Sequence, residues 1–417
     1  MLPFVRNNAR WLAAGFLLSL FSSFGQTFFI GLSGAEFQAR FDLSGGEFGL
    51  IYMVATLASA ATLPWIGKVM DVMRGRTVAA MVMPGLAAAC LLAAWSPHFI
   101  GFVVALYLLR LLGQGMMTHI AQTETARAFV ANRGRAMSLV VPGHQAGEAI
   151  LPALFVLVAA ALGWQGAWTA AAALILVIGM PVIIGLLAKP RVPQQAEINH
   201  ANAREGRNWT RAEVIRDPVF YLLLLGLLAP PFIGTTIFFH QGHLIDVRGY
   251  DQLAFAGAFP VMAMTTVGFG LVCGYLVDRF GSVRLLPFFL VPICIASLAA
   301  ASITALWGIY LFMFLFGVSY GLTSNMFGVI WPEVYGIAHL GSIRALVVSG
   351  MVLATALGPG ITGALIDQGI TLPQQLWWMA LWCVFATGAL VLAARIIRSR
   401  TAQPDQQQMR GLPHTVR

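Results

Sequence analysis

Arg110 and Glu148 are the two clearly charged residues that lie deep inside long apolar stretches of this 417-residue sequence. Each stands about 12 residues from the end of its stretch, which is about 18 Å along a helix. If the stretches cross a membrane, both side chains lie near its middle, where a charge costs at least about 2.5 kcal/mol. Such charges face the interior of a helix bundle and have partners there. We therefore expect Arg110 and Glu148 to lie close together.

The chemistry that these two residue types suggest is proton binding linked to anion binding. Glu148 would bind a proton and thereby free Arg110 to bind a carboxylate or another acceptor group. A permanent ion pair that fixes helix packing is the alternative. His144 lies one turn before Glu148 on the same helical face, where it could pass a proton or bind a solute. A hydrogen-bonded packing residue is the alternative for His144.

Further polar and aromatic residues lie in the apolar stretches. The polar candidates to line a cavity with Arg110 are Gln26, Gln114, Tyr320 and Asn325. Polar groups in a bundle core also bond neighbouring helices, which is their alternative role. Apolar walls could come from Phe24, Phe28, Phe232 and Phe238, although phenylalanine mostly packs or faces lipid. His240 and His243 end one stretch and are interpreted as rim residues, so we expect no metal and no cofactor.

The elements that must position these residues follow from composition. The sequence is 59% hydrophobic and 10% charged, whereas a soluble domain carries about 25% charged residues. The apolar runs are long enough for membrane-spanning helices, and the alternation typical of barrel strands is absent. The four cysteines lie within these runs and are interpreted as packing residues. We predict an all-α integral membrane protein with twelve transmembrane helices, at about 10–31, 46–66, 77–96, 98–122, 136–162, 165–188, 218–241, 252–276, 284–302, 304–329, 343–366 and 376–397.

The distribution of the basic residues supports this count. Of the 25 Lys and Arg residues, all but Arg40, Arg110 and Arg248 fall in segments that lie on one side of the membrane if the N-terminus is inside. Basic residues concentrate on the cytoplasmic side of membrane proteins. We therefore place both termini in the cytoplasm and the protein in the plasma (inner) membrane. The net charge of +9 then orients the chain and contacts anionic lipid, and nucleic acid is excluded as a partner.

The sequence repeats itself after about half its length. Gly67 and Asp71 recur as Gly274 and Asp278, 207 residues later. Glu124 and Arg135 recur as Glu333 and Arg344, 209 residues later. Duplicated halves are typical of secondary transporters, with the binding site between them. We predict an N-terminal six-helix half over 1–188, a cytoplasmic linker or short surface helix over 189–217, a C-terminal half over 218–400 and a disordered tail over 401–417.

The repeated loop resembles a motif of the major facilitator superfamily, and the resemblance extends over nearly the whole chain. The second half has Gly274-Tyr-Leu-Val-Asp278-Arg279-Phe-Gly281, which is similar to the G-x-x-x-D-R-x-G loop of that family. The first half keeps Gly67 and Asp71, but its Arg74-Gly75-Arg76 is shifted by one residue. Arg110 also resembles a family arginine in the fourth helix. The resemblance implies a cytoplasmic gate that involves Gly67, Asp71, Arg76, Glu124, Arg135, Gly274, Asp278, Arg279, Gly281, Glu333 and Arg344, with plain surface charge as the alternative.

The resemblance implies a secondary active transporter of a small organic solute that works by alternating access. A proton is the expected coupling ion, because no phosphate-binding loop is present. A carboxylate-bearing substrate fits if Arg110 is available, and Gly358-Pro359 is loosely similar to the monocarboxylate and organic-anion branch. The alternatives are an exporter of drugs or toxic compounds, which Glu148 disfavours because that signature has proline there, and a facilitator of a neutral or zwitterionic metabolite. We expect a monomer that is not an enzyme.

Overall fold

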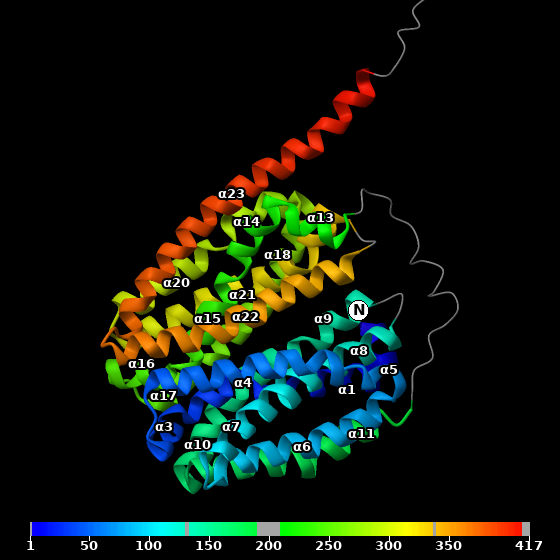
Figure 1. Ribbon diagram of the computed structural model, residues 1–417. Helices are drawn as coiled ribbons and strands as arrows, with labels where there is room; N and C mark the ends of the chain where they lie inside the picture. The colour runs from blue at the N-terminus through cyan, green and yellow to red at the C-terminus, as the bar shows by residue number, and fades with distance from the viewer. Residues whose placement is uncertain (1, 130–132, 190–208, 337–338, 411–417) are drawn as a thin grey trace, which may run out of the picture.

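The computed structural model describes residues 2–129, 133–189, 209–336 and 339–410. It is built from helices, which form two bundles that lie side by side (Figure 1). The helices of the first half are α1 (Leu2–Phe21), α2 (Thr27–Ile30), α3 (Gly34–Phe41), α4 (Gly45–Ile66), α5 (Val69–Val72), α6 (Gly75–Trp95), α7 (Phe99–Leu108), α8 (Thr118–Ala128), α9 (Arg133–Val140), α10 (Pro142–Ala173) and α11 (Met180–Leu186).

The second half begins with a short helix before its first span. Its helices are α13 (Arg211–Arg216), α14 (Pro218–Leu227), α15 (Ala229–Phe239), α16 (Gln241–Arg248), α17 (Gln252–Ala256), α18 (Phe259–Phe280), α19 (Ser282–Leu285), α20 (Val291–Ser302), α21 (Leu306–Tyr335), α22 (Leu340–Asp367) and α23 (Leu372–Arg410). The backbone amide of Trp209 donates to Tyr335, so α13 is attached to the second half. Residues 190–208 of the predicted linker lie outside the described residues.

Among the described residues, ten helical runs are long and apolar enough to cross a membrane, and a bent pair over Phe4–Phe41 makes an eleventh. One run, Arg135–Leu186, has 52 residues, about 78 Å of helix, which is more than twice the hydrocarbon thickness. Gly163 divides that run, because its φ of 74° and ψ of 165° are not helical. The described residues therefore contain helices enough for the twelve transmembrane spans expected from the sequence.

The backbone has a local feature in the seventh span and another in the C-terminal tail. The helix of the seventh span breaks at Leu228, between α14 and α15, directly before Pro230 and Pro231. The proline rings cannot continue the hydrogen bonds of α14, so a new helix starts there. The tail differs from the disordered end that we expected, because α23 continues as helix to Arg410. Residues 411–417 lie outside the described residues.

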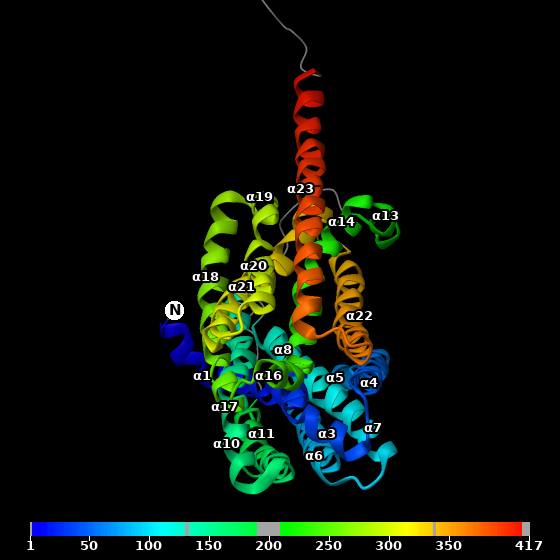
Figure 2. The same cartoon turned by 90° about the vertical axis from the view of Figure 1, so that its left-hand side faces the viewer.

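We call the end of the molecule that carries Leu2, α5 and α13 the terminal face, and the end that carries α3, α16 and α17 the opposite face (Figure 1). At the opposite face, α4 packs along α22, and Figure 2 shows these two helices next to each other. The Asp367 carboxylate accepts hydrogen bonds from the Ser44 hydroxyl at 2.7 Å and the Gly46 amide at 2.9 Å. The Phe239 ring lies 4.4 Å from that of Tyr52. The two halves are therefore closed against each other at the opposite face.

Contacts at the terminal face are different. The hydrogen bonds that we find there among the described side chains, such as Ser282 to Glu333 and Arg400 to Asp217, join elements of the same half. Polar contacts between the halves lie at the opposite face, where Gln241 also donates to the Phe28 carbonyl at 2.8 Å. Within the described part of the chain, the side-chain hydrogen bonds between the halves thus gather at one end.

Candidate functional site

Arg110 lies on a π-helical segment, η3 (Leu109–Met117), between α7 and α8. Its side chain is buried, with the residue 3% exposed. One guanidinium nitrogen, Nη1, donates to the Gly25 carbonyl at 3.3 Å and to the Thr27 hydroxyl at 3.4 Å. The guanidinium carbon lies 5.2 Å from the centre of the Tyr52 ring. Nε is buried and has no hydrogen-bond partner, so Arg110 retains a free donor.

The carbonyl that binds Arg110 comes from a break in the first span. Gln26 is extended, with φ of −85° and ψ of 156°, between the 3₁₀ turn η1 (Ser22–Gly25) and α2. A β-carbon on Gly25 would overlap the Leu109 carbonyl and lie 2.7 Å from the Cα of Gly113. The two glycines therefore let the broken first span touch η3 directly. Broken helices and π-helical turns are features of membrane-protein binding sites.

Glu148 and His144 form a second polar group on α10. Nε2 of His144 lies 3.3 Å from Oε1 of Glu148, which is 3% exposed. The other carboxylate oxygen, Oε2, and Nδ1 of His144 are buried without hydrogen-bond partners. Tyr320 of α21 lies within electrostatic range of Glu148, so a side chain from the second half approaches this group. Each member of the pair therefore keeps one polar atom that a proton, water or solute could bind.

Arg110 and Glu148 do not form a direct ion pair, which was the alternative to a proton and substrate site. Among the described residues, no carboxylate lies within 4.0 Å of the Arg110 guanidinium. The break at Gln26 supplies a carbonyl that binds the guanidinium, whereas His144, one turn away on the same helix, binds Glu148. Each charged side chain thus has partners of its own, and neither charge neutralises the other directly.

A series of aromatic rings connects the two halves. The series runs His144, Phe28, Phe259, Phe238, Phe316 and Tyr320, with successive ring centroids 6.2, 6.0, 5.4, 5.4 and 4.8 Å apart. We call this series the aromatic belt. Two of the four predicted phenylalanines belong to it. The other two pack elsewhere, Phe24 against Phe29 at 5.0 Å and Phe232 against Trp382 at 5.2 Å.

The remaining predicted cavity and rim residues differ in burial and in their contacts. Gln26, Gln114 and Tyr320 are half-buried, and Gln26 stands at the break itself. The side chain of Asn325 lies outside the described part of α21. His240, predicted to be a rim residue, is buried, and its Nε2 lies 2.9 Å from the Pro359 carbonyl at the opposite face. The described residues contain no group of three or more His, Cys, Asp or Glu that could hold a metal.

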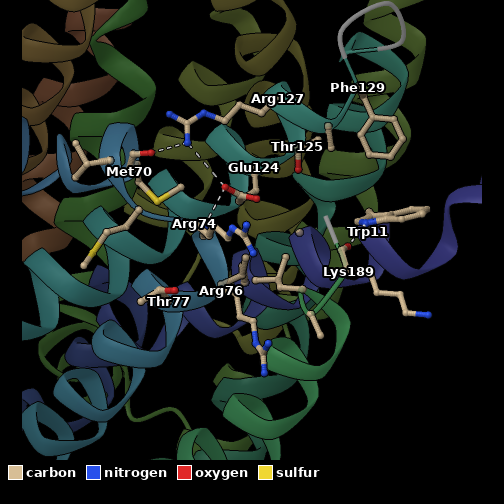
Figure 3. A pocket seen from close by; sticks show the side chains of 18 residues that line it. Trp11, Met70, Arg74, Arg76, Thr77, Glu124, Thr125, Arg127, Phe129 and Lys189 are labelled. Carbon is tan, nitrogen blue, oxygen red and sulfur yellow. Dashed lines mark hydrogen bonds and ion pairs between the residues drawn. The ribbon is translucent and has the colours of Figure 1, made fainter. Parts of the chain in front are cut away.

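The repeated acidic residues make equivalent contacts in the two halves. Oε1 of Glu124 accepts the Gly75 amide at 3.2 Å, at the start of α6, as Figure 3 shows. Glu333 accepts the hydroxyl of Ser282, at the start of α19. In both halves the glutamate that ends the fourth helix of the repeat thus holds the start of the third. A carboxylate is favourable there because helix N-termini carry partial positive charge.

Among the described side chains, the other predicted gating residues are not brought together across the halves. Arg344 donates to the Gly328 carbonyl at 2.8 Å and Arg279 to the Tyr275 hydroxyl at 3.1 Å. Arg76 and Arg135 are exposed, and Gly274 lies within α18. The Gly67 carbonyl lies 3.3 Å from His119 Nε2, and Gly281 takes φ of 80°, which favours glycine. The side chains of Asp71 and Asp278 lie outside the described part of the chain.

Sequence reasoning missed several residues that contribute to these arrangements. Thr27 and Tyr52 surround Arg110, and their hydroxyl oxygens lie 2.6 Å apart. Asp217 binds Arg400 through two 2.8 Å hydrogen bonds. The dipeptide Asp217-Pro218 was a usable signal, because aspartate before proline is typical of a helix start. No comparable signal existed for Thr27 and Tyr52, which depend on where the first span breaks.

Comparisons with known proteins agree with this architecture. A bacterial homologue of the human lysosomal transporter Spinster, solved inward-facing and unoccupied, is 15% identical, with a TM-score of 0.70 over 94% of this chain and 98% of that one. The D-xylose–proton symporter is 14% identical (TM-score 0.67, 93% and 95% covered), as is the nucleoside transporter NupG (0.66, 92% and 98%). These likenesses concern the fold.

A comparison with curated protein sequences finds no match. The family model described as Major Facilitator Superfamily matches residues 15–359, which extend into both halves of the repeat and include Arg110 and Glu148. The chain therefore belongs to the major facilitator superfamily of membrane transporters.

Proposed function

We propose that this protein is a proton-coupled secondary active transporter of a small organic solute that bears a carboxylate. The supporting observation is that Arg110 and Glu148 are both buried, are not paired with each other, and each keep a buried polar atom without a hydrogen-bond partner. A buried unsatisfied group is costly, so a site of this kind suits occupation by a solute, a proton or water.

Arg110 is the proposed anchor for the substrate carboxylate. Its Nη1 contacts a carbonyl and a hydroxyl, which are neutral acceptors, so the positive charge has no carboxylate against it among the described residues. Arginine binds carboxylates through two parallel hydrogen bonds, which require a free edge of the guanidinium. The free Nε belongs to such an edge. This favours a carboxylate-bearing solute over a neutral one.

Glu148 and His144 are the proposed proton site. The pair can hold one proton between Oε1 and Nε2. The free Oε2 and Nδ1 could each bind a further proton, a water molecule or a solute. Proton carriers within membrane spans are usually carboxylates and histidines that pair with each other. Tyr320 belongs to the second half and lies within electrostatic range of Glu148, so a change in the charge of Glu148 acts on a side chain of the second half.

The proposed transport cycle is alternating access. With both termini in the cytoplasm, as the basic residues suggest, the terminal face is cytoplasmic and the closed opposite face is external. The protein is then in an inward-facing state, with a monomer in the plasma (inner) membrane as the working unit. Separation of Asp367 from Ser44 and Gly46 would open the external side.

The test is solute uptake by the purified protein in proteoliposomes. We expect a panel of labelled small carboxylates to contain a solute that accumulates only when the outside is more acidic than the inside. Arg110→Gln should abolish uptake, whereas Arg395→Gln, the same change at an exposed position of α23, should not. Export, or uptake that ignores the pH step, would instead favour the exporter or the facilitator.

A further inference from the structure

A cavity of about 470 Å³ lies at the terminal face of the first half, apart from Arg110 and Glu148. It is formed where the middle of α1, the short helix α5, the start of α6 and the end of α8 meet the residues that follow α11. Figure 3 shows Arg74 and Arg76, at the start of α6, on one side and Trp11 and Lys189 on the other. None of the transport steps proposed above uses this cavity.

The cavity is basic. Its described lining contains one acidic residue, Glu124, and four basic residues: Arg74, Arg76, Arg127 and Lys189. Glu124 is already engaged by the Gly75 amide at 3.2 Å and lies 4.0 Å from Arg127. The 21-residue helix α6 begins here, and its N-terminus adds partial positive charge. The site therefore suits an anionic ligand with several acceptor oxygens, such as a phosphate group.

The apolar part of the lining points to a lipid as the source of that phosphate. Leu18, Met70 and Phe129 line the cavity but are almost fully buried, so the large apolar side chains that are exposed to a ligand are those of Val72 and Met73. Val72, which also lines the cavity, is 84% exposed, as expected for a side chain next to lipid. The Trp11 indole donates to the Lys189 carbonyl at 2.8 Å, and tryptophan gathers at the level of lipid headgroups. A soluble phosphate would have no use for these apolar surfaces.

We propose that this cavity binds the phosphate of an anionic phospholipid from the leaflet at the terminal face. Arg74 and Lys189 approach the phosphate from opposite sides, and the start of each acyl chain lies toward Val72. The lipid would connect α1 to the start of α6 and to the end of α8. It would therefore stabilise the packing of these ends in the first half. Basic pockets between transmembrane helices are a known way to hold such headgroups.

The experiment is lipid binding by the full chain in detergent, followed by native mass spectrometry and by thermal unfolding. We expect phosphatidylglycerol to bind more tightly than phosphatidylcholine and to raise the midpoint of unfolding. Each basic residue near an anionic headgroup accounts for about fivefold in affinity, so Arg74→Gln combined with Lys189→Gln should weaken phosphatidylglycerol binding by about 25-fold. Thr77→Trp, which fills the cavity and keeps every charge, should weaken it as well.

The matched control removes two basic residues from the second half, Arg284→Gln with Arg398→Gln, both exposed. This control should bind phosphatidylglycerol like the unchanged protein. Equal loss in the control and the cavity variants would overturn the proposal, because it would show binding by overall charge. A stabilising effect of inorganic phosphate over chloride at equal ionic strength, without one from phosphatidylglycerol, would also overturn it. If the double variant does not fold, Thr77→Trp decides alone.

Discussion

Nε2 of His144 lies 3.3 Å from Oε1 of Glu148, one helical turn away on α10. The carboxylate is buried, and its second oxygen has no hydrogen-bond partner. A proton on this pair changes the charge of a site that Tyr320 of the other half also approaches. Removal of the ionisable group should therefore separate solute movement from proton movement.

Glu148→Gln should transport solute without coupling it to protons. The amide keeps the size of the side chain but cannot gain or lose a proton. For one proton per solute, a pH step of one unit should drive about tenfold accumulation in the unchanged protein and none in the variant. Exchange of labelled for unlabelled solute should persist, because it needs no net proton movement. Both rates are measured in proteoliposomes.

Asp42→Asn is the matched control for that experiment. Asp42 is exposed and has φ of 52°, a conformation that asparagine also accepts. The same carboxylate-to-amide change should leave accumulation unaltered there. Unchanged pH-driven accumulation in Glu148→Gln would show that the coupling proton binds elsewhere.

Arg110→Lys should weaken substrate binding although it keeps the positive charge. An ammonium cannot present the planar edge that binds a carboxylate in two places. It also cannot reach Gly25 and Thr27 while it faces a solute. We expect KM to rise about tenfold or more, with a smaller change in the maximal rate. A KM within twofold of the unchanged value would argue against Arg110 as the substrate anchor.

The global architecture was predictable because it depends on sequence features that many residues share. An error of a few residues in one helix boundary changes none of three features: the twelve apolar runs, the asymmetry of the basic residues, and the spacing between Glu124 and Glu333. The common role of these glutamates, one at the start of α6 and one at the start of α19, is the structural counterpart of the repeat. Helix ends were harder, as the continuation of α23 to Arg410 shows.

The partners of the buried charges were not predictable in the same way. Equal depth on neighbouring helices placed Arg110 and Glu148 at one level, but depth does not fix the direction in which a side chain points. The direction of Arg110 depends on the π-helical turn of η3 and on the break at Gln26. Neither feature is marked in the sequence by a proline or by a run of charged residues. Gly25 and Gly113 permit the contact, yet the sequence holds 43 glycines.

Gly363→Ala should open the opposite face. The new β-carbon would overlap the Gly45 carbonyl where α22 packs on α4, so the helices must separate. Overpacking of this kind costs about 1–3 kcal/mol, enough to shift a two-state equilibrium at least fivefold. The measurement is labelling of Met53→Cys by a membrane-impermeant maleimide, because Met53 lies at the Gly360 contact. Gly242→Ala, where a β-carbon meets nothing nearer than 4.0 Å, should leave the labelling rate unchanged.

Asp217→Asn should reduce stability at neutral pH but not in acid. Burial alone would raise the pKa of Asp217, yet hydrogen bonds from Arg400, the Val219 amide and the Tyr335 hydroxyl outweigh it and hold this pKa below its ordinary value. A carboxylate with a lowered pKa stabilises the fold above the unfolded pKa of about 3.9, and the effect disappears as the pH falls through the folded pKa. We expect the variant to lose about 2 kcal/mol at pH 7, seen as a lower unfolding midpoint in detergent, and the difference to close below about pH 4. Asp42→Asn, which removes an exposed carboxylate, should show no such difference at either pH. A gap that persists in acid would mean that Asp217 acts through its shape and not through its charge.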